Sequence, residues 1–182
     1  MEEKQFNKIR NGMLLAVVLF AVCHLTWEYF NGGVVTHYLF MRADLPGLSN
    51  WWGLLILPLL VLLSSTAIKK RISTKPDAKT LPWSVLLGFF GMLLVSTVQS
   101  IVFVIGLPNV TMYLALGVII SALFLPLYRM ECILGHVIGS TFVFGPAIPF
   151  VGVLMFAPLS LLSHKCIKPL LLRFKKGETA VT

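Results

Sequence analysis

The sequence predicts an all-α, polytopic integral membrane protein, a bundle of six transmembrane helices with both termini in the cytoplasm. Of the 182 residues, 57% are hydrophobic and 12% are charged, whereas a soluble domain is usually about a quarter charged. The mean hydropathy is +0.88, and the apolar residues form runs close to the roughly 20 residues that a transmembrane helix needs. Short segments that are basic, or rich in proline and glycine, separate these runs.

The first predicted helix covers residues 12–30. The N-terminus starts basic and then turns apolar, as a signal peptide does, but no small-x-small cleavage pattern ends the apolar run. We therefore expect a retained helix that ends at Gly32 and Gly33, since glycine commonly follows a helix C-terminus. The next segment, VVTHYLFM, is too short to span a membrane and too apolar for an open loop. It predicts an extracytoplasmic interfacial or re-entrant segment between the first two helices.

This segment leads into the second helix and admits two interpretations. Trp51 and Trp52 suit the membrane interface, where an indole places its N–H in water, so the segment could be a simple interfacial anchor. Alternatively, it forms a lid over the outer face of the bundle. A lid would bring His37, Asp44 and Asn50 toward the polar residues of the helices beneath it.

Five further helices are predicted. They cover residues 51–68, 83–105, 110–128, 130–144 and 148–163. The last two divide one apolar run that is too long for an ordinary span and that contains the breaker GPAIP at 145–149. A single bent helix is the rival interpretation and would give five spans. We assign 1–174 to one transmembrane domain and 175–182 to a disordered cytoplasmic tail.

The basic residues favour six spans. With the N-terminus in the cytoplasm, every Lys and Arg except Arg42 lies on the cytoplasmic side, as the positive-inside rule expects. The net charge of +8 therefore reflects topology and attraction to anionic lipid headgroups. Nucleic-acid binding is excluded, because the basic residues form no single patch with interleaved aromatic residues. The chain is compact and has no obvious eukaryotic sorting signal, so we expect the cell membrane, specifically a bacterial inner membrane.

The first helix carries the strongest candidates for catalytic residues. His24 and Glu28 are four residues apart, so they share one face of the helix. With a rise of about 1.5 Å per residue, they lie roughly 18 and 24 Å from the start of the span, in its outer half. Ionisable residues at membrane depth are rare and often functional. The alternative is a purely structural His–Glu pair that fastens the helix to the outer loop.

Three more polar residues lie within later helices. Gln99 reaches the same depth as Glu28, although an interhelical hydrogen bond would also explain it. His136 and Ser140 follow a polar stripe on the fifth helix, beside the close-packing motif Gly135-x-x-x-Gly139. We therefore expect His136 to face another helix rather than lipid, and both residues are candidates for substrate binding.

No metal or cofactor follows from these residues. Two ligands on one helix do not make a zinc site, which normally takes three or four protein ligands. The cysteines Cys23, Cys132 and Cys166 show no metal spacing. A haem between His24 and His136 is disfavoured, because their predicted depths differ by several ångströms. Any cofactor stays unidentified.

The favoured hypothesis is a membrane-embedded site that binds or acts on a lipid, an isoprenoid or a small apolar molecule. His24 and Glu28 would be its acid–base or ligand-orienting groups. The second hypothesis is a small transporter or proton-coupled channel, for which a homo-oligomer or an in-membrane partner would supply further polar residues. The third is a scaffold or accessory subunit. Membrane lipids are the expected partners in every case.

Overall fold

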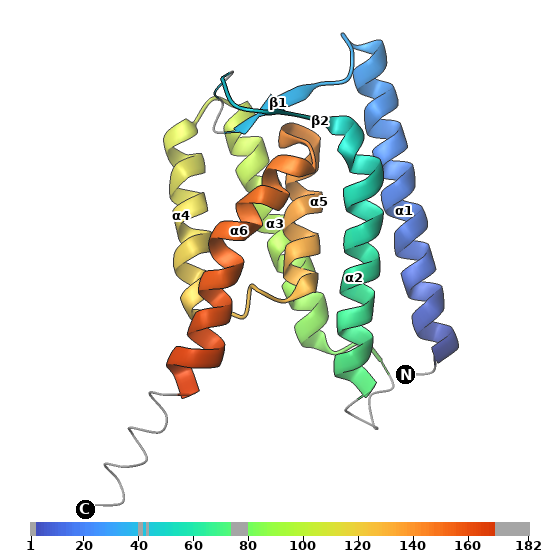
Figure 1. The fold of residues 1–182 in the computed structure, drawn as a ribbon, viewed down its shortest axis with the longest axis vertical. Helices are drawn as coiled ribbons and strands as arrows, with labels where there is room; N and C mark the ends of the chain where they lie inside the picture. Colours follow the sequence, from blue (N-terminus) through green and yellow to red (C-terminus); the bar gives the residue numbers. More distant parts are fainter. Residues whose placement is uncertain (1–2, 40–41, 43, 74–79, 170–182) are drawn as a thin grey trace, which may run out of the picture.

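Six α-helices run side by side in the computed structural model of this chain, and a two-stranded sheet crosses one end of the bundle (Figure 1). The structure describes residues 3–39, 42, 44–73 and 80–169. Consecutive helices alternate in direction (Figure 1). The helices are α1 (Glu3–Phe30), α2 (Gly53–Ser73), α3 (Trp83–Val104), α4 (Pro108–Phe124), α5 (Met130–Phe144) and α6 (Ala147–Leu162), which a π-helical turn, η3 (Ser163–Ile167), continues.

Four of these helical segments are long and apolar enough to cross a membrane. They are Glu3–Phe30, Asn50–Ser73, Trp83–Val104 and Ala147–Ile167. The helices α4 and α5 are apolar but shorter, with 17 and 15 residues. At about 1.5 Å per residue, α5 is only roughly 22 Å long. The chain is therefore all-α apart from the small sheet, as predicted, while a six-span topology stays a prediction.

The bounds of several helices differ from those predicted. Helix α2 runs to Ser73 instead of residue 68, and the differences in α1 and α4 have clear physical reasons. The first helix starts at Glu3 instead of near residue 12, because the polar residues before the apolar run are compatible with a helix and nothing breaks it. A hydropathy pattern marks where a helix enters lipid, not where it begins. The fourth helix ends at Phe124 instead of Tyr128, since Pro126 cannot continue it and disfavours a helical residue before it.

The break predicted within 131–163 is confirmed. Gly145 follows α5 with a φ of 65°, a left-handed conformation that glycine adopts readily. Pro146 then precedes α6, and α5 and α6 run in opposite directions (Figure 1). A single bent helix is therefore not observed.

The segment after α1 is a β-hairpin rather than a re-entrant segment. Strand β1 (Thr36–Tyr38) pairs antiparallel with β2 (Gly47–Ser49), and His37 lies opposite Leu48. Isolated two-stranded hairpins are marginal in water, so this one needs support from the helices below it. A short 3-10 turn, η2 (Asn50–Trp52), joins β2 to α2. We call this end of the bundle the hairpin end and the opposite end the basic end.

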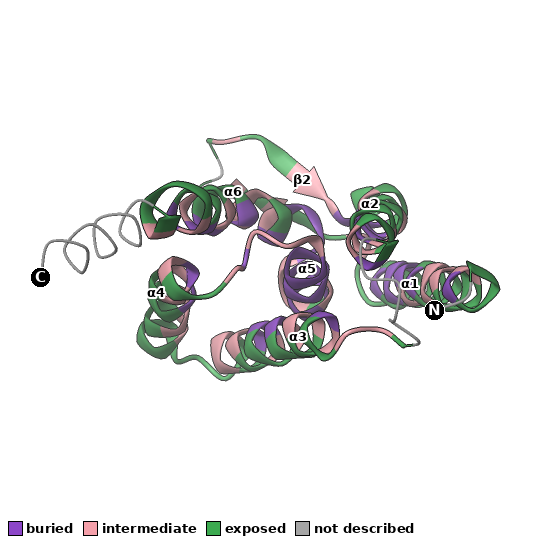
Figure 2. Ribbon diagram, turned by 90° about the horizontal axis from the view of Figure 1, so that it is seen from below, coloured by how far each residue is buried: buried purple, intermediate pink, exposed green. Residues whose placement is uncertain are grey.

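Helix α5 lies in the middle of the bundle, and Figure 2 shows it surrounded by other helices. Every residue from Glu131 to Val137 is buried. Gly135 and Gly139 face α3, and a Cβ at Gly135 would collide with the backbone oxygen of Phe89. Small residues of this kind allow two helix backbones to approach closely. The close-packing role predicted for the pair is thereby confirmed.

The outward faces of the other helices are strongly apolar. Large side chains are exposed along the bundle, for example Leu55 at 57%, Leu94 at 65%, Ile120 at 57% and Leu154 at 69%. Soluble monomers rarely expose contiguous apolar surface of this extent. The charges are distributed unevenly: every Lys and Arg that the structure describes, apart from Arg42, lies in the half of the bundle toward the basic end.

Candidate functional site

Two ionisable side chains of α1 are buried at the hairpin end. His24 and Glu28 are 6% and 4% exposed. Since they lie four residues apart, they lie on one face of the helix, and His24 Nε2 is 3.5 Å from Glu28 Oε1. A buried carboxylate needs compensating partners, and the hairpin supplies most of them.

The hairpin and the turn after it complete the coordination of Glu28. The side-chain amide of Asn50 donates a 2.5 Å hydrogen bond to Glu28 Oε1. The backbone N–H of Val35 donates to Glu28 Oε2 at 3.3 Å, and the N–H of Asn50 donates to the carbonyl of Val35 at 3.0 Å. The chain segments on both sides of the hairpin thus contact each other and the same carboxylate.

His37 on β1 is the fourth polar residue. Its Nε2 lies 3.4 Å from Nδ2 of Asn50. Burial lowers the pKa of His37 below the usual value of 6.5, an effect that the charge of Glu28 opposes and that of His24 reinforces. A neutral imidazole can accept a hydrogen bond on Nε2, so Asn50 bridges Glu28 and His37. We call His24, Glu28, His37 and Asn50 the hairpin cluster.

The turn between α5 and α6 closes the cluster from the other side. A Cβ at Gly145 would collide with Oδ1 of Asn50 and would lie 3.1 Å from the His37 ring. The His24 ring lies between two phenylalanines, with centroids 6.0 Å from Phe20 and 5.2 Å from Phe142. The buried Nε2 of His24 forms no hydrogen bond with any described residue. Its nearest charged neighbour is Glu28 Oε1 at 3.5 Å, so within the cluster Nε2 of His24 is the buried polar atom that lacks a hydrogen-bond partner among the described residues.

Two predicted binding residues lie outside the hairpin cluster. Asp44 is exposed and paired with Arg42 at 2.6 Å, and the Arg42 guanidinium lowers the pKa of that carboxyl below its usual range. The side chain of Gln99 donates to the carbonyl of Thr111 at 3.4 Å, which connects α3 to α4. The lid interpretation therefore holds for His37 and Asn50 but not for Asp44 and Gln99.

The remaining two candidates form part of a separate polar region on α5. His136 Nδ1 is 2.7 Å from the hydroxyl of Ser96 on α3, and its ring packs edge-on against Phe156 of α6. The expectation that His136 faces other helices is confirmed. Ser140 is buried one turn further along α5. Neither residue is part of the hairpin cluster.

Sequence reasoning missed a buried ion pair near the basic end. Glu131 is only 2% exposed and is bridged by Arg71 of α2 at 2.7 Å. The sequence does hold a signal, because α2 ends in a basic run and α5 begins with one carboxylate. No sequence signal indicates that the backbone N–H of Val35 donates to Glu28 or that Gly145 packs against Asn50 and His37.

The hairpin cluster contains two histidines and one glutamate, residue types that bind metals, but the structure does not place them as a set of metal ligands. Among the residues that the structure describes, no group of three or more His, Cys, Asp or Glu side chains is placed to hold a metal ion. What the cluster offers chemically is a carboxylate and two imidazoles, held by an amide in a setting from which water is largely excluded. Comparisons of the chain with models of protein families, with curated proteins and with solved structures give no match.

Proposed function

We propose that the chain is a six-span protein of the cell membrane, with the basic end in the cytoplasm and the hairpin on the outer side. The apolar outward faces and four helices of sufficient length support a membrane location. The distribution of Lys and Arg supports the orientation, because cytoplasmic segments carry an excess of these residues. In this arrangement both termini are cytoplasmic, and a bacterial inner membrane is the membrane we expect.

Within this topology, the hairpin cluster binds, or acts on, a lipid, an isoprenoid or a small apolar molecule that carries a polar group. The observation that carries the proposal is the buried carboxylate of Glu28 with two imidazoles around it, one of which leaves Nε2 without a hydrogen bond to any described residue. Buried polar atoms almost always have a partner. A hydroxyl or carbonyl group of a ligand would satisfy His24 Nε2.

The roles of the residues follow from their partners. His24 would donate to, or accept from, the polar group of the ligand, and Glu28, whose Oε1 lies 3.5 Å from His24 Nε2, would orient the imidazole. Asn50 and Val35 hold Glu28 in place. A His–carboxylate pair of this kind is suited to proton transfer.

The rival functions have less support. A transporter or proton-coupled channel needs polar groups at successive depths, and Glu131, His136 and Glu28 lie along the bundle. However, His136 is bonded to Ser96 and Glu131 to Arg71, so each is engaged within its own region. A scaffold or accessory subunit remains the third candidate, because Glu28 also fastens the hairpin to α1.

Native mass spectrometry of the gently extracted protein tests the proposal. Wild type is compared with Glu28→Gln and with Asp44→Asn, a matched control that neutralises an exposed carboxylate on the same hairpin. We expect a defined extra mass on wild type and Asp44→Asn that is lost from Glu28→Gln. The same mass on all three proteins would place the ligand elsewhere.

Bare protein in all three samples would remove a tightly held ligand and favour flux assays in liposomes. If Glu28→Gln and His24→Gln lower only the thermal stability, with no ligand and no flux, the scaffold function is supported instead.

A further inference from the structure

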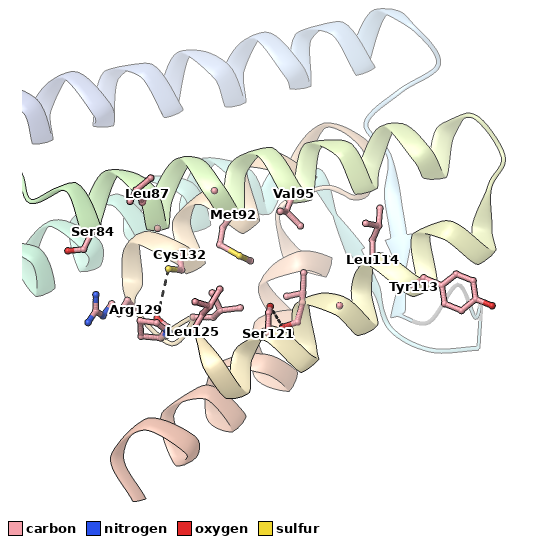
Figure 3. A pocket seen from close by; sticks show the side chains of 16 residues that line it. Ser84, Leu87, Met92, Val95, Tyr113, Leu114, Ser121, Leu125, Arg129 and Cys132 are labelled. Carbon is pink, nitrogen blue, oxygen red and sulfur yellow. Dashed lines mark hydrogen bonds between the residues drawn. The ribbon is translucent and has the colours of Figure 1, made fainter. Parts of the chain in front are cut away.

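An elongated cavity lies between α3, α4 and α5, away from the hairpin cluster (Figure 3). Its volume is about 550 Å³, within the range of roughly 300–1,000 Å³ that small-molecule sites occupy. None of the four hairpin-cluster residues lines it. The cavity exists because α4 packs on α3 and α6 and stands away from α5.

Two glycines keep the cavity open. Gly91 on α3 and Gly117 on α4 line it, and a Cβ at either position would meet no atom within 4 Å. Glycine within a helix costs about 1 kcal/mol relative to alanine, so a packing reason is expected for each. Gly135 and Gly139 have one, the backbone of α3. At Gly91 and Gly117 no such neighbour is described, and the absent side chains widen the cavity instead.

The lining is apolar along its length and polar at its ends. The walls are formed mainly by Leu87, Met92, Val95, Leu114, Val118 and Leu125. Figure 3 shows Ser84 and Arg129 at one end and Tyr113 at the other. Since α3 begins and α4 ends at the basic end, the end with Arg129 is the one at the basic end of the bundle. Leu87 is 68% exposed and Leu125 52%, so the cavity opens sideways toward the surrounding medium.

The end with Arg129 carries positive charge. Within the described ranges, the Arg129 guanidinium takes part in no ion pair, whereas the neighbouring carboxylate of Glu131 is bridged by Arg71. Lys168 lies close by, since its Nζ donates to the carbonyl of Phe124, the residue before Leu125. Guanidinium groups bind phosphate oxygens in bidentate fashion, and basic pockets between helices bind acidic lipid headgroups.

We propose that this cavity binds one acyl chain of an anionic phospholipid from the leaflet at the basic end, with the lipid phosphate at Arg129. The shape, the apolar walls and the single cationic end match an amphiphile with one chain inserted and an acidic headgroup at the surface. The second chain stays outside, against the exposed faces of α3 and α4. This site is independent of the hairpin cluster and of the ligand proposed there.

The test uses the full chain, exchanged into micelles or nanodiscs that contain phosphatidylglycerol or phosphatidylcholine with identical acyl chains. Native mass spectrometry counts the lipids that remain bound to wild type, Gly117→Leu, Arg129→Gln and Gly152→Leu. Gly117→Leu fills the cavity without touching another residue at its Cβ. Gly152→Leu on α6 is the matched control, because its Cβ also meets no atom within 4 Å and it does not line the cavity.

We expect wild type and Gly152→Leu to retain one phosphatidylglycerol with about tenfold preference over phosphatidylcholine. Both lipids carry a phosphate, but the choline cation of phosphatidylcholine is repelled by Arg129 and Lys168, whereas phosphatidylglycerol is a net anion. Gly117→Leu loses the retained lipid, and Arg129→Gln retains both lipids equally. Retention of phosphatidylglycerol by Gly117→Leu, or equal retention of both lipids by wild type, would overturn the proposal.

Two further variants show whether lipid loss comes from misfolding or from a change at the hairpin cluster. Gly91→Leu fills the cavity from the opposite wall, and it replaces Gly117→Leu if that variant lacks a cooperative thermal transition. Glu28→Gln is expected to keep its phosphatidylglycerol, because it lies outside the cavity. If Glu28→Gln loses the hairpin-site ligand and keeps the lipid, both proposals are supported. If wild type carries no hairpin-site ligand and keeps the lipid, the first proposal fails and the second is supported.

Discussion

A single carboxylate, that of Glu28, connects three parts of the chain. It accepts hydrogen bonds from Asn50 and from the backbone of Val35, and it lies beside His24 on its own helix. Hydrogen bonds to an ionised group contribute about 1.5–3 kcal/mol each. Because the group is buried, its partners have no water to replace it if it is removed.

Glu28→Gln is therefore expected to lower the free energy of unfolding by about 1–3 kcal/mol. The amide keeps one acceptor oxygen but turns an N–H₂ group toward donors. Denaturant titration of the protein in micelles measures the loss. Asp44→Asn is the control, since an exposed pair contributes roughly 0–1 kcal/mol. Equal destabilisation by the two substitutions would contradict the burial of Glu28.

His37 makes the free energy of unfolding depend on pH. Its pKa in the folded protein lies below 6.5, so the unfolded chain binds its proton first as pH falls. The free energy of unfolding of wild type therefore decreases as pH falls below about 6.5 toward the folded pKa. Above this range His37 is neutral in both states and has no effect on the slope.

The expected result is a thermal midpoint that falls more steeply between pH 7.5 and 5.5 for wild type than for His37→Gln, which keeps an acceptor for Asn50. The difference between the two curves isolates His37 from Glu28 and His24, which face it from α1. Parallel curves would show that His37 does not contribute to the pH dependence of stability.

At the scale of helices, α5 is held against α3 by close contact of the two backbones at a pair of glycines. Gly135 and Gly139 lie against α3, where any added carbon meets backbone atoms that cannot move without shifting the helix. Overpacking of this kind typically costs about 1–3 kcal/mol. The neighbouring helix α6 offers the opposite case at Gly152, which has open space around it.

The same substitution at these two positions should have opposite effects. Gly135→Ala is expected to reduce the free energy of unfolding by about 1–3 kcal/mol. Gly152→Ala should leave it unchanged or raise it by up to about 1 kcal/mol, through helix propensity. Parallel unfolding titrations in one detergent compare them, and a loss at Gly152 as large as that at Gly135 would refute the close approach of α3 and α5.

How far the sequence predicts the structure also becomes clear at this scale. Apolar runs and breaker residues predict all six helices and the turn at Gly145, because these signals are local. Depth along a helix follows from residue count, so His24 and Glu28 were placed together. Which neighbouring helix a given side chain faces does not follow from residue count. Gln99 faces α4 instead of the hairpin cluster, and Glu131 faces Arg71 of α2.

The hairpin shows the other limit. Its strands are three residues each, too short for a clear alternating pattern, and its pairing depends on contacts with α1 and with the turn at Gly145. The lid interpretation predicted that His37 and Asn50 would lie near Glu28. It also predicted this of Asp44, which instead pairs locally with Arg42. A local ion pair two residues apart competes with any distant partner.

At the scale of the whole molecule, charge asymmetry predicts orientation. Arg42 and Asp44 lie at the hairpin end, and Cys166 is an exposed native thiol in η3 at the basic end. We expect a membrane-impermeant maleimide to label Asp44→Cys in intact cells, in a background with Cys166 replaced by serine. It should label native Cys166 only after the membrane is opened. The reverse pattern would invert the topology.

The burial of α5 also has a consequence for biosynthesis. This helix carries Glu131 in its first turn and His136 near its middle, and a charged residue in a lone helix opposes membrane insertion by up to about 2.5–3.5 kcal/mol, the cost at the helix centre. Its principal partners, Arg71 of α2 and Ser96 of α3, are made earlier in translation. In the six-span topology proposed above, nascent α5 would therefore enter a lipid bilayer that already contains the groups that pair with its polar side chains. Chain order and assembly order would then coincide, and the helix that carries Glu131 and His136 would be inserted only after its binding partners are in place.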